Sequence, residues 1–338
     1  MPSSVTHTYF ANCVLEKLPP HIHAQIKTEK NIFNLSAQGS DPFMFRDFFL
    51  GPHAKQGQAI QNKMHLTHTQ KFFTTTLSYI KRNHLEKNPE VLSYLYGNIC
   101  HYYLDLTMHP FIDYQAGHFI KGQKQTYYAN TLHQKIEYRI DSYIIKNKLR
   151  KDPKTFPIHQ YIFSSPNISP TLKKMIKENL KEIYQIDNAD TFYQKSLKDM
   201  KKFFQYVNYD PHGYKHFFYK TFDRITPKWM LRLEELSYHT KETGENYLNL
   251  DHQEWCFPWD NSTYSKKSFF DLWRDATTKA INTIIEIDKL LNHQKNHLKE
   301  KEIFSNLSYS TGLPCERNVK YQYFKENKNE ITTAKKKR

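Results

Sequence analysis

One segment gives the strongest structural signal in this chain: His101-Tyr102-Tyr103-Leu104-Asp105-Leu106-Thr107-Met108-His109-Pro110. On an α-helix, side chains four residues apart lie one turn above the other on the same face. His101, Asp105 and His109 would therefore form a ladder of imidazole, carboxylate and imidazole among apolar neighbours. Buried ionisable groups are rarely left unpaired, so such a ladder calls for a cation. We expect the helix to end at Pro110, because the residue before a proline disfavours helical geometry.

Composition and charge set wide bounds on the remainder. The chain has 338 residues, enough to bury a sizeable core, and only nine glycines, which favours helices joined by short loops. Lys and Arg number 49 and Asp and Glu 34, an excess of 15 positive charges. This balance favours anionic partners such as phospholipid surfaces or nucleic acid. Solvated surface lysines would produce the same balance.

The apolar spacing is helical along most of the chain. It predicts helices over 6–26, 43–49, 64–85, 89–109, 125–149, 168–185, 189–206, 211–222 and 267–293, with Pro19-Pro20 interrupting the first. No segment shows strict period-two alternation, so strands are not expected. The fold class predicted is therefore all-α.

We expect a single multi-helix domain over residues 1–297. Its metal-binding half would be 1–150, and further helices would fill 151–297. From about residue 298 the periodicity is lost, and 298–338 is predicted to be a flexible basic tail that ends in four consecutive cationic residues.

The cysteines and the first residues of the chain indicate a cellular location. The four cysteines show no C-x-x-C spacing, so they read as reduced thiols and not as a disulfide framework. The first residues lack the pattern of a signal peptide, and no window approaches the roughly 20 apolar residues of a membrane span. We expect a cytoplasmic protein without a transmembrane segment.

Single ligand pairs carry little weight in a histidine-rich chain. Composition alone predicts roughly two pairs of the form His-x-x-x-Asp/Glu. The pairs present are His101 to Asp105, His109 to Asp113 and His133 to Glu137. Their conjunction is more informative, because the ladder lies on one predicted helix and the last pair on the next. Helix bundles build metal sites from facing helices in this way.

The ligand types indicate which metal would bind. Three imidazoles and two carboxylates without a thiolate suit zinc. One tetrahedral zinc ion accepts at most four of these five groups, so a polynuclear site is plausible.

Several segments of the chain present potential ligands in a distinctive order. They are Thr6-His7, Gln38-Gly39-Ser40-Asp41-Pro42, Met64-His65, Gly97-Asn98-Ile99-Cys100-His101 through Asp105 to His109-Pro110, and His133-x-x-x-Glu137. In this order of ligand types the chain resembles the bacterial zinc-dependent phospholipase C family, whose fold is shared with the fungal single-strand-specific zinc nucleases. The resemblance covers about the first 150 residues, and the segment 255–259 with the following helix is similar to the family's closing segment.

The resemblance implies up to three zinc ions in a cleft. It assigns the first ion to Asp41, His65, His101 and Asp105. It assigns the second ion to His109, His133 and Glu137. The third would be held by His7, by Asp105 as a bridge, and by the N-terminal amine and carbonyl, the amine being that of Pro2 once Met1 is removed. Asp41 would also be the catalytic residue that accepts the proton of the attacking water.

The function implied is that of a zinc-dependent phosphodiester hydrolase, phospholipase C-like, acting on a phospholipid or related phosphodiester. Residues 151–297 look helical, so the β-sandwich membrane-binding module of the toxin-like members is not expected. One alternative is a single-strand nuclease, for which the basic balance and the Tyr and Phe residues would serve nucleic-acid binding. Another is a non-catalytic zinc-binding protein. The sequence indicates no specific protein partner.

Overall fold

The computed structural model describes residues 4–119, 126, 128–226, 232–239, 246–292 and 300–325. The amino-terminal part contains α1 (Ser4–Leu15), α2 (Pro20–Thr28), α3 (Lys30–Ser36), η1 (Asp41–Phe49), α4 (Ala54–Leu66) and α5 (Thr69–Arg82). The middle contains α6 (Pro89–Ala116), α7 (Tyr128–Tyr143), η3 (Ile144–Lys148), α8 (Ile158–Tyr161), α9 (Pro170–Tyr184), α10 (Ala189–Lys202) and η4 (Phe203–Asn208). The remainder contains α11 (Tyr214–Ile225), η5 (Glu234–Leu236), β1 (Trp255–Phe257), β2 (Asp260–Ser265), α12 (Phe269–Leu291) and α13 (Glu300–Ile303). The prediction of a mainly helical fold is confirmed.

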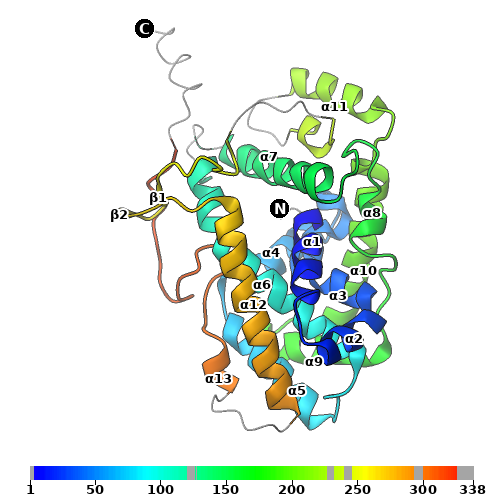
Figure 1. Ribbon diagram of the computed structural model, residues 1–338. Coiled ribbons are helices and arrows are strands. Elements are labelled where there is room, and N and C mark those ends of the chain that lie inside the picture. Colours follow the sequence, from blue (N-terminus) through cyan, green and yellow to red (C-terminus); the bar gives the residue numbers. More distant parts are fainter. Residues whose placement is uncertain are drawn as a thin grey trace.

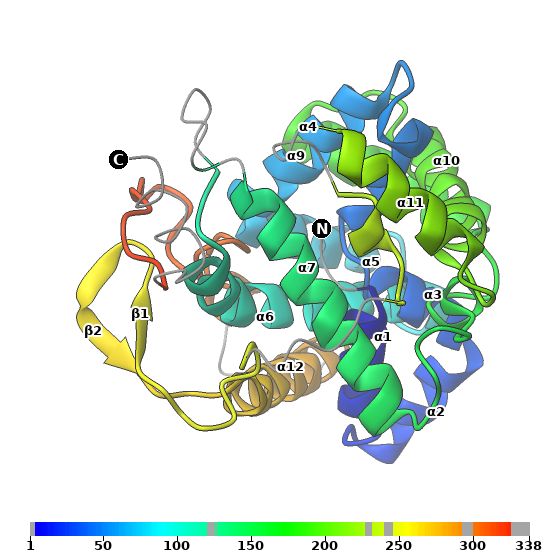
Figure 2. The same ribbon diagram turned by 90° about the horizontal axis from the view of Figure 1, so that it is seen from above.

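The bundle is organised around α6. This helix packs against α1, α2, α3, α7 and α12, and α7 lies across one end of the bundle (Figures 1 and 2). Nearly every residue of α6 is buried, as expected for a central helix, and the buried set includes the polar ladder His101, Asp105 and His109. Its start is defined by Asn88, whose side chain accepts a hydrogen bond from Val91 N, and by Pro89 in the first turn.

The predicted end of this helix at Pro110 is wrong. The helix continues through Pro110 to Ala116. Proline removes only its own N–H donor, which in a helix would serve the carbonyl of Leu106. The backbone of Gly312 packs close to that carbonyl, so close that a Cβ at Gly312 would lie 2.7 Å from the Leu106 oxygen. The surrounding contacts thus hold the helix together across the proline.

Two other predicted helices are divided. The range 6–26 becomes α1 and α2, because Pro19 is extended and Pro20 starts a new helix. The range 64–85 covers the end of α4 and all of α5, separated by Thr67 in extended and His68 in left-handed backbone conformation. His65 therefore lies in the last turn of α4 and not in a first turn.

A β-hairpin is present where no strand was expected. Strands β1 and β2 pair antiparallel across the Pro258-Trp259 turn, with an irregularity between Cys256 and Phe257. The first strand has only three residues, too few for alternation to be recognisable in the sequence.

The predicted tail requires a correction over 300–325. Within this segment Phe304 and Tyr309 are buried, and Tyr309 N donates a 3.0 Å hydrogen bond to the carbonyl of His65. Single aromatic anchors produce no periodicity, so the sequence pattern did not reveal this packing. The basic stretch at 326–338 lies outside the described residues.

Two further expectations can be compared with the structure. The four cysteines are free thiols, as predicted. None of the described helices combines the length with the apolar character that a membrane span requires.

Candidate metal centre

Five elements bring together eight of the predicted ligands. They are His7 of α1, Asp41 of η1, His65 of α4, His101, Asp105 and His109 of α6, and His133 and Glu137 of α7. All are buried except His133, which is half-buried. Pro2, the remaining predicted ligand, lies outside the described residues.

Asp105 is the centre of this cluster. Its Oδ1 lies 3.1 Å from His7 Nε2 and 3.8 Å from His109 Nε2. Its Oδ2 lies 3.1 Å from His101 Nε2 and 3.9 Å from His65 Nε2. The two oxygens of one carboxylate thus face different sets of imidazoles, which is the geometry of a bridging ligand.

Three groups of side chains place their ligand atoms within 4.8 Å of one another. The groups are His7, His101 and Asp105; Asp41, His65 and His101; and His109, His133 and Glu137. The third group is identical to the set predicted for the second ion. The second group is the set predicted for the first ion, with Asp105 adjoining it.

The loop before η1 explains why the sequence reads Gln38-Gly39-Ser40-Asp41. Gly39 has a positive φ of 56°, and a Cβ there would lie 2.1 Å from Cδ2 of the His101 ring. Only glycine lets the backbone approach this imidazole so closely. The Gln38 amide donates to Ser4 O at 3.2 Å and to Thr8 Oγ1 at 2.9 Å, and so ties the loop to α1.

The start of α1 is held by a carboxylate that the sequence did not identify. Asp141, on α7, accepts hydrogen bonds from Thr6 N at 2.8 Å, Thr6 Oγ1 at 2.6 Å and Val5 N at 3.3 Å. The hydroxyl of Tyr238 donates to the same carboxylate at 3.0 Å. A carboxylate at a helix N-terminus satisfies backbone donors that have no partner within the helix. This contact fixes the position of His7, the next residue.

Two of the histidines are oriented by groups outside the predicted set. His109 Nδ1 donates to the carbonyl of Tyr309 at 2.9 Å, which leaves Nε2 turned toward Asp105. His133 Nδ1 lies 3.0 Å from Asp113 Oδ1, and its Nε2 lies 3.0 Å from Glu137 Oε1. Partners of this kind are typical behind metal-binding imidazoles. Asp113 could have been found by its His-x-x-x-Asp spacing, whereas Tyr309 has no signal of its own in the sequence.

The acidic and basic side chains of the cluster shift one another's pKa values. Burial acts to raise the pKa of Asp105, yet His101, His109 and His7 hold that pKa well below its usual value. Burial acts to lower the pKa of His101, but Asp105 and Asp41 raise it to about 9. For His133, Glu137 and Asp113 likewise outweigh burial and raise the pKa to about 9. Without a cation, protons are therefore the positive charge that the cluster retains.

Asp41 has a buried carboxylate oxygen that a cation could complete. Its Oδ2 receives no hydrogen bond from the described residues, and His101 Nε2 lies 3.8 Å from it. The other oxygen, Oδ1, accepts from the Gln61 amide at 3.2 Å. A buried carboxylate oxygen without a donor is costly unless a metal or proton completes it. The buried groups fit a metal ion.

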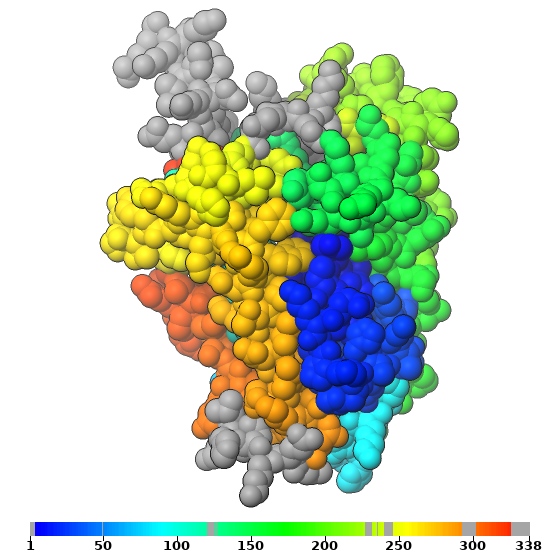
Figure 3. All heavy atoms as spheres, viewed as in Figure 1, coloured from blue at the N-terminus to red at the C-terminus, as the bar shows by residue number. Residues whose placement is uncertain are grey.

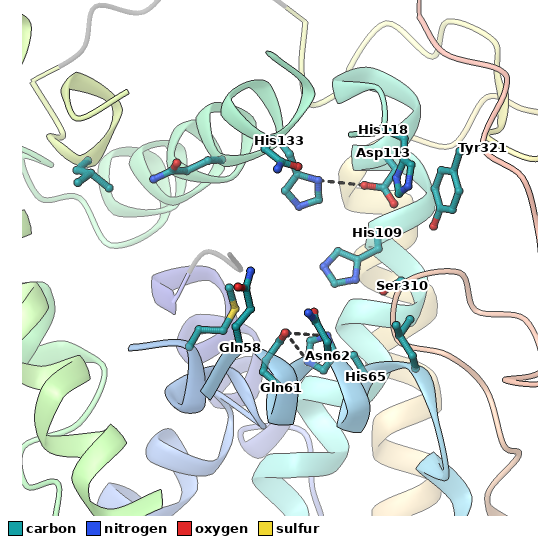
Figure 4. Close-up of a pocket in the computed structure, with 15 residues that line it drawn as sticks. Gln58, Gln61, Asn62, His65, His109, Asp113, His118, His133, Ser310 and Tyr321 are labelled. Atoms are coloured by element: carbon teal, nitrogen blue, oxygen red, sulfur yellow. Dashed lines mark hydrogen bonds and ion pairs between the residues drawn. The ribbon is translucent and has the colours of Figure 1, made fainter. Parts of the chain in front are cut away.

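The cluster borders a solvent-accessible pocket at His65, His109 and His133. These three residues line a pocket of about 510 Å³ below α7. Figure 4 shows His133 reaching from α7 toward His109 on α6, with Gln61, Asn62 and His65 rising from α4. Tyr321 and Ser310, from the segment predicted to be a tail, complete the wall. The arrangement allows a small ligand to contact imidazoles of the cluster.

No protein-family model, curated protein or solved structure matches this chain.

Proposed function

We propose that the protein is a zinc-dependent phosphodiester hydrolase, phospholipase C-like in its chemistry, acting on a phospholipid or a related small phosphodiester. One observation carries the proposal. Three clusters, each made of three histidine and carboxylate side chains, lie side by side, and imidazoles from two of these clusters line one pocket. A purely structural metal site is closed, whereas a catalytic one keeps a position open to substrate.

The residues present define how zinc would be held. Asp41, His65, His101 and Asp105 would hold one ion, and His109, His133 and Glu137 a second. His7 and Asp105 would contribute to a third. Zinc bound in this way would supply a water nucleophile at neutral pH and neutralise charge on the phosphoryl oxygens.

The residues around the metal groups have roles of their own. The carboxylate of Asp41, whose Oδ2 lacks a donor, is placed to accept a proton at that oxygen. Asp113 holds the imidazole of His133, and the carbonyl of Tyr309 holds that of His109. The amides of Gln58, Asn62 and the other neutral side chains of the pocket would bind a head group.

The lining of the pocket favours a small substrate over a polynucleotide. Among the described residues no Lys or Arg lines it, and its charged groups are the imidazoles and Asp113. Single-stranded nucleic acid is bound along positively charged grooves that follow the backbone. The excess positive charge of the chain therefore lies elsewhere than at this pocket.

The test combines metal analysis with hydrolysis assays. Purified protein would be assayed on a chromogenic phosphodiester, a phosphatidylcholine emulsion and single-stranded DNA, beside Asp105→Ala and the surface control Asp187→Ala. We expect the unaltered protein and Asp187→Ala to bind at least two zinc ions per chain and to hydrolyse the small diester. Asp105→Ala should lose both properties. Bound zinc without hydrolysis of any substrate would identify a non-catalytic zinc protein. Hydrolysis of DNA alone would identify a nuclease.

A further inference from the structure

The helix α11 presents its apolar side chains to solvent. Its exposed large residues are Tyr214 (71%), Phe217 (68%), Phe218 (69%), Phe222 (44%) and Ile225 (80%). On a helix these positions lie on one face and form a continuous stripe. The other exposed large apolar residues of the described chain occur singly or in pairs along the sequence, as is normal for a protein surface.

The opposite face of α11 is polar and bonded to the protein. Asp223 is buried and accepts hydrogen bonds from Leu233 N at 3.0 Å and Glu234 N at 2.8 Å. Lys215 Nζ donates to the carbonyls of Tyr206 at 2.6 Å and Tyr209 at 2.7 Å. These bonds fix the rotation of the helix about its axis, so the stripe cannot turn inward without breaking them.

The charges beside the stripe have one sign. Lys220 and Arg224 are exposed along one edge of the stripe, and the only acidic residue of α11 is the buried Asp223. A surface that carries aromatic and aliphatic side chains bordered by cations is complementary to anionic head groups above an acyl layer.

We propose that α11 docks on the surface of a membrane that contains anionic phospholipid. The helix has 12 residues, or about 18 Å, which is too short to cross a bilayer but suffices to lie in its interface. It stands out at the edge of the molecule (Figures 1 and 3). The stripe would enter the head-group layer while Lys220 and Arg224 contact phosphates.

The position of α11 relates this surface to the pocket. The short helix η5 packs against both α11 and α7, and its Leu236 lines the pocket. Docking would therefore bring one wall of the pocket to the lipid surface. The docking itself requires no hydrolysis, so it stands or falls independently of the proposed enzyme activity.

Co-sedimentation with vesicles tests the proposal. Full-length protein would be mixed with vesicles of phosphatidylcholine alone and of phosphatidylcholine with phosphatidylserine. We expect the protein to bind the vesicles that contain phosphatidylserine, and added salt should weaken this binding. The affinity should fall at least about tenfold in Phe217→Ser/Phe218→Ser, because this variant lacks the two large apolar side chains that transfer from water into the lipid. Leu50→Ser, which removes an even more exposed apolar side chain elsewhere, should bind as the original does. Lys220→Gln/Arg224→Gln should lose the preference for phosphatidylserine.

Three results would overturn the proposal. The first is no binding of the unaltered protein to either vesicle, and the second is undiminished binding of the Phe217→Ser/Phe218→Ser variant. The third is a lipid-free dimer, seen by sedimentation velocity, that this variant abolishes, since the stripe would then be a contact between two copies. Unchanged thermal unfolding of the variants, together with unchanged hydrolysis of a soluble phosphodiester where there is any, separates loss of docking from loss of the fold or site.

Discussion

At the scale of single residues, the position of Asp105 is the most consequential. One carboxylate faces four imidazoles at distances of 3.1 to 3.9 Å. Helical spacing alone predicted its contacts with His101 and His109. Its contacts with His7 and His65 depend on two other helices, and only the resemblance to a known ligand order indicated them.

Asp113 should matter although it lies outside the predicted ligand set. The change Asp113→Ala leaves Nδ1 of His133 without its acceptor, so the ring is no longer oriented. We expect zinc affinity to fall about 10- to 100-fold, as for other residues that support metal ligands. Competition with a chromogenic chelator measures this, with Asp187→Ala as the exposed control. An unchanged affinity would mean that Asp113 does not orient the site.

Protons and metal should compete for the cluster. In metal-free protein the carboxylates raise the pKa of His101 and His133 to about 9. A histidine whose pKa is raised by folding stabilises the folded state fully below its unfolded pKa, near 6.5, and this contribution is lost as pH rises through about 9. Metal-free protein should thus lose on the order of 3 kcal/mol of unfolding free energy per histidine over this interval.

Two measurements check this pH dependence. Denaturant unfolding of chelator-treated protein between pH 6.5 and 9 gives the loss of stability. Calorimetric titration with zinc in buffers of different ionisation enthalpy gives the protons released, which should be at least one per chain at pH 7. Zinc binding without proton release would show that His101 and His133 are neutral before the metal arrives.

At the scale of helices and loops, burial overrides local preference. Sequence rules predict a helix end at Pro110, yet α6 passes through it, because most residues of the flanking turns are buried. Conversely, α4 and α5 are separated at Thr67 and His68 without any proline or glycine. Tertiary contacts determine where these helices end, and such contacts cannot be read from a single sequence.

Gly312 should be necessary for the packing beside Pro110. Its φ is +66°, and a Cβ there would approach the Leu106 carbonyl oxygen to 2.7 Å. Gly213 offers a matched control, because its φ is +77° and its ψ is 8°, and a Cβ there would come no closer than 3.4 Å to the His239 ring. Gly213→Ala should cost about 1–2 kcal/mol of unfolding free energy from backbone strain alone. Gly312→Ala should cost about 1–3 kcal/mol more through the clash. Equal losses in denaturant unfolding would contradict the close approach.

Asp141 should be the anchor of α1. Replacing it with Ala leaves Val5 N, Thr6 N and the hydroxyl of Tyr238 without their acceptor. We expect a loss of about 1–3 kcal/mol in unfolding free energy, since buried donors would remain unsatisfied. The zinc content per chain should also fall, because this contact fixes the position of the ligand His7. The exposed Asp187→Ala provides the comparison, and a loss no larger than in that variant would exclude the anchoring role.

At the scale of the whole molecule, the helical class and most helix positions could be predicted, because an apolar face repeats every three to four residues over ten or more positions. Helical spacing also predicted which ligands share a face of α6 or α7, whereas the convergence of His7, Asp41 and His65 on them was indicated only by the resemblance to a known ligand order. Asp141 and Tyr309 act through contacts that span more than 100 residues of sequence, and such pairings leave no local pattern. The hairpin at 255–265 and the packed segment 300–325 were missed because both are short or irregular.

The most direct test of the central claim is the zinc content of the purified protein. The claim is that the buried groups around Asp105 form a polynuclear metal centre. Chelator-stripped protein would be reloaded with zinc, freed of excess and analysed for metal per chain, beside Asp105→Ala and Asp187→Ala. The account predicts at least two ions per chain in the unaltered protein and in Asp187→Ala, and a clear deficit in Asp105→Ala. Fewer than two ions in the unaltered protein, or an undiminished content in Asp105→Ala, would contradict it.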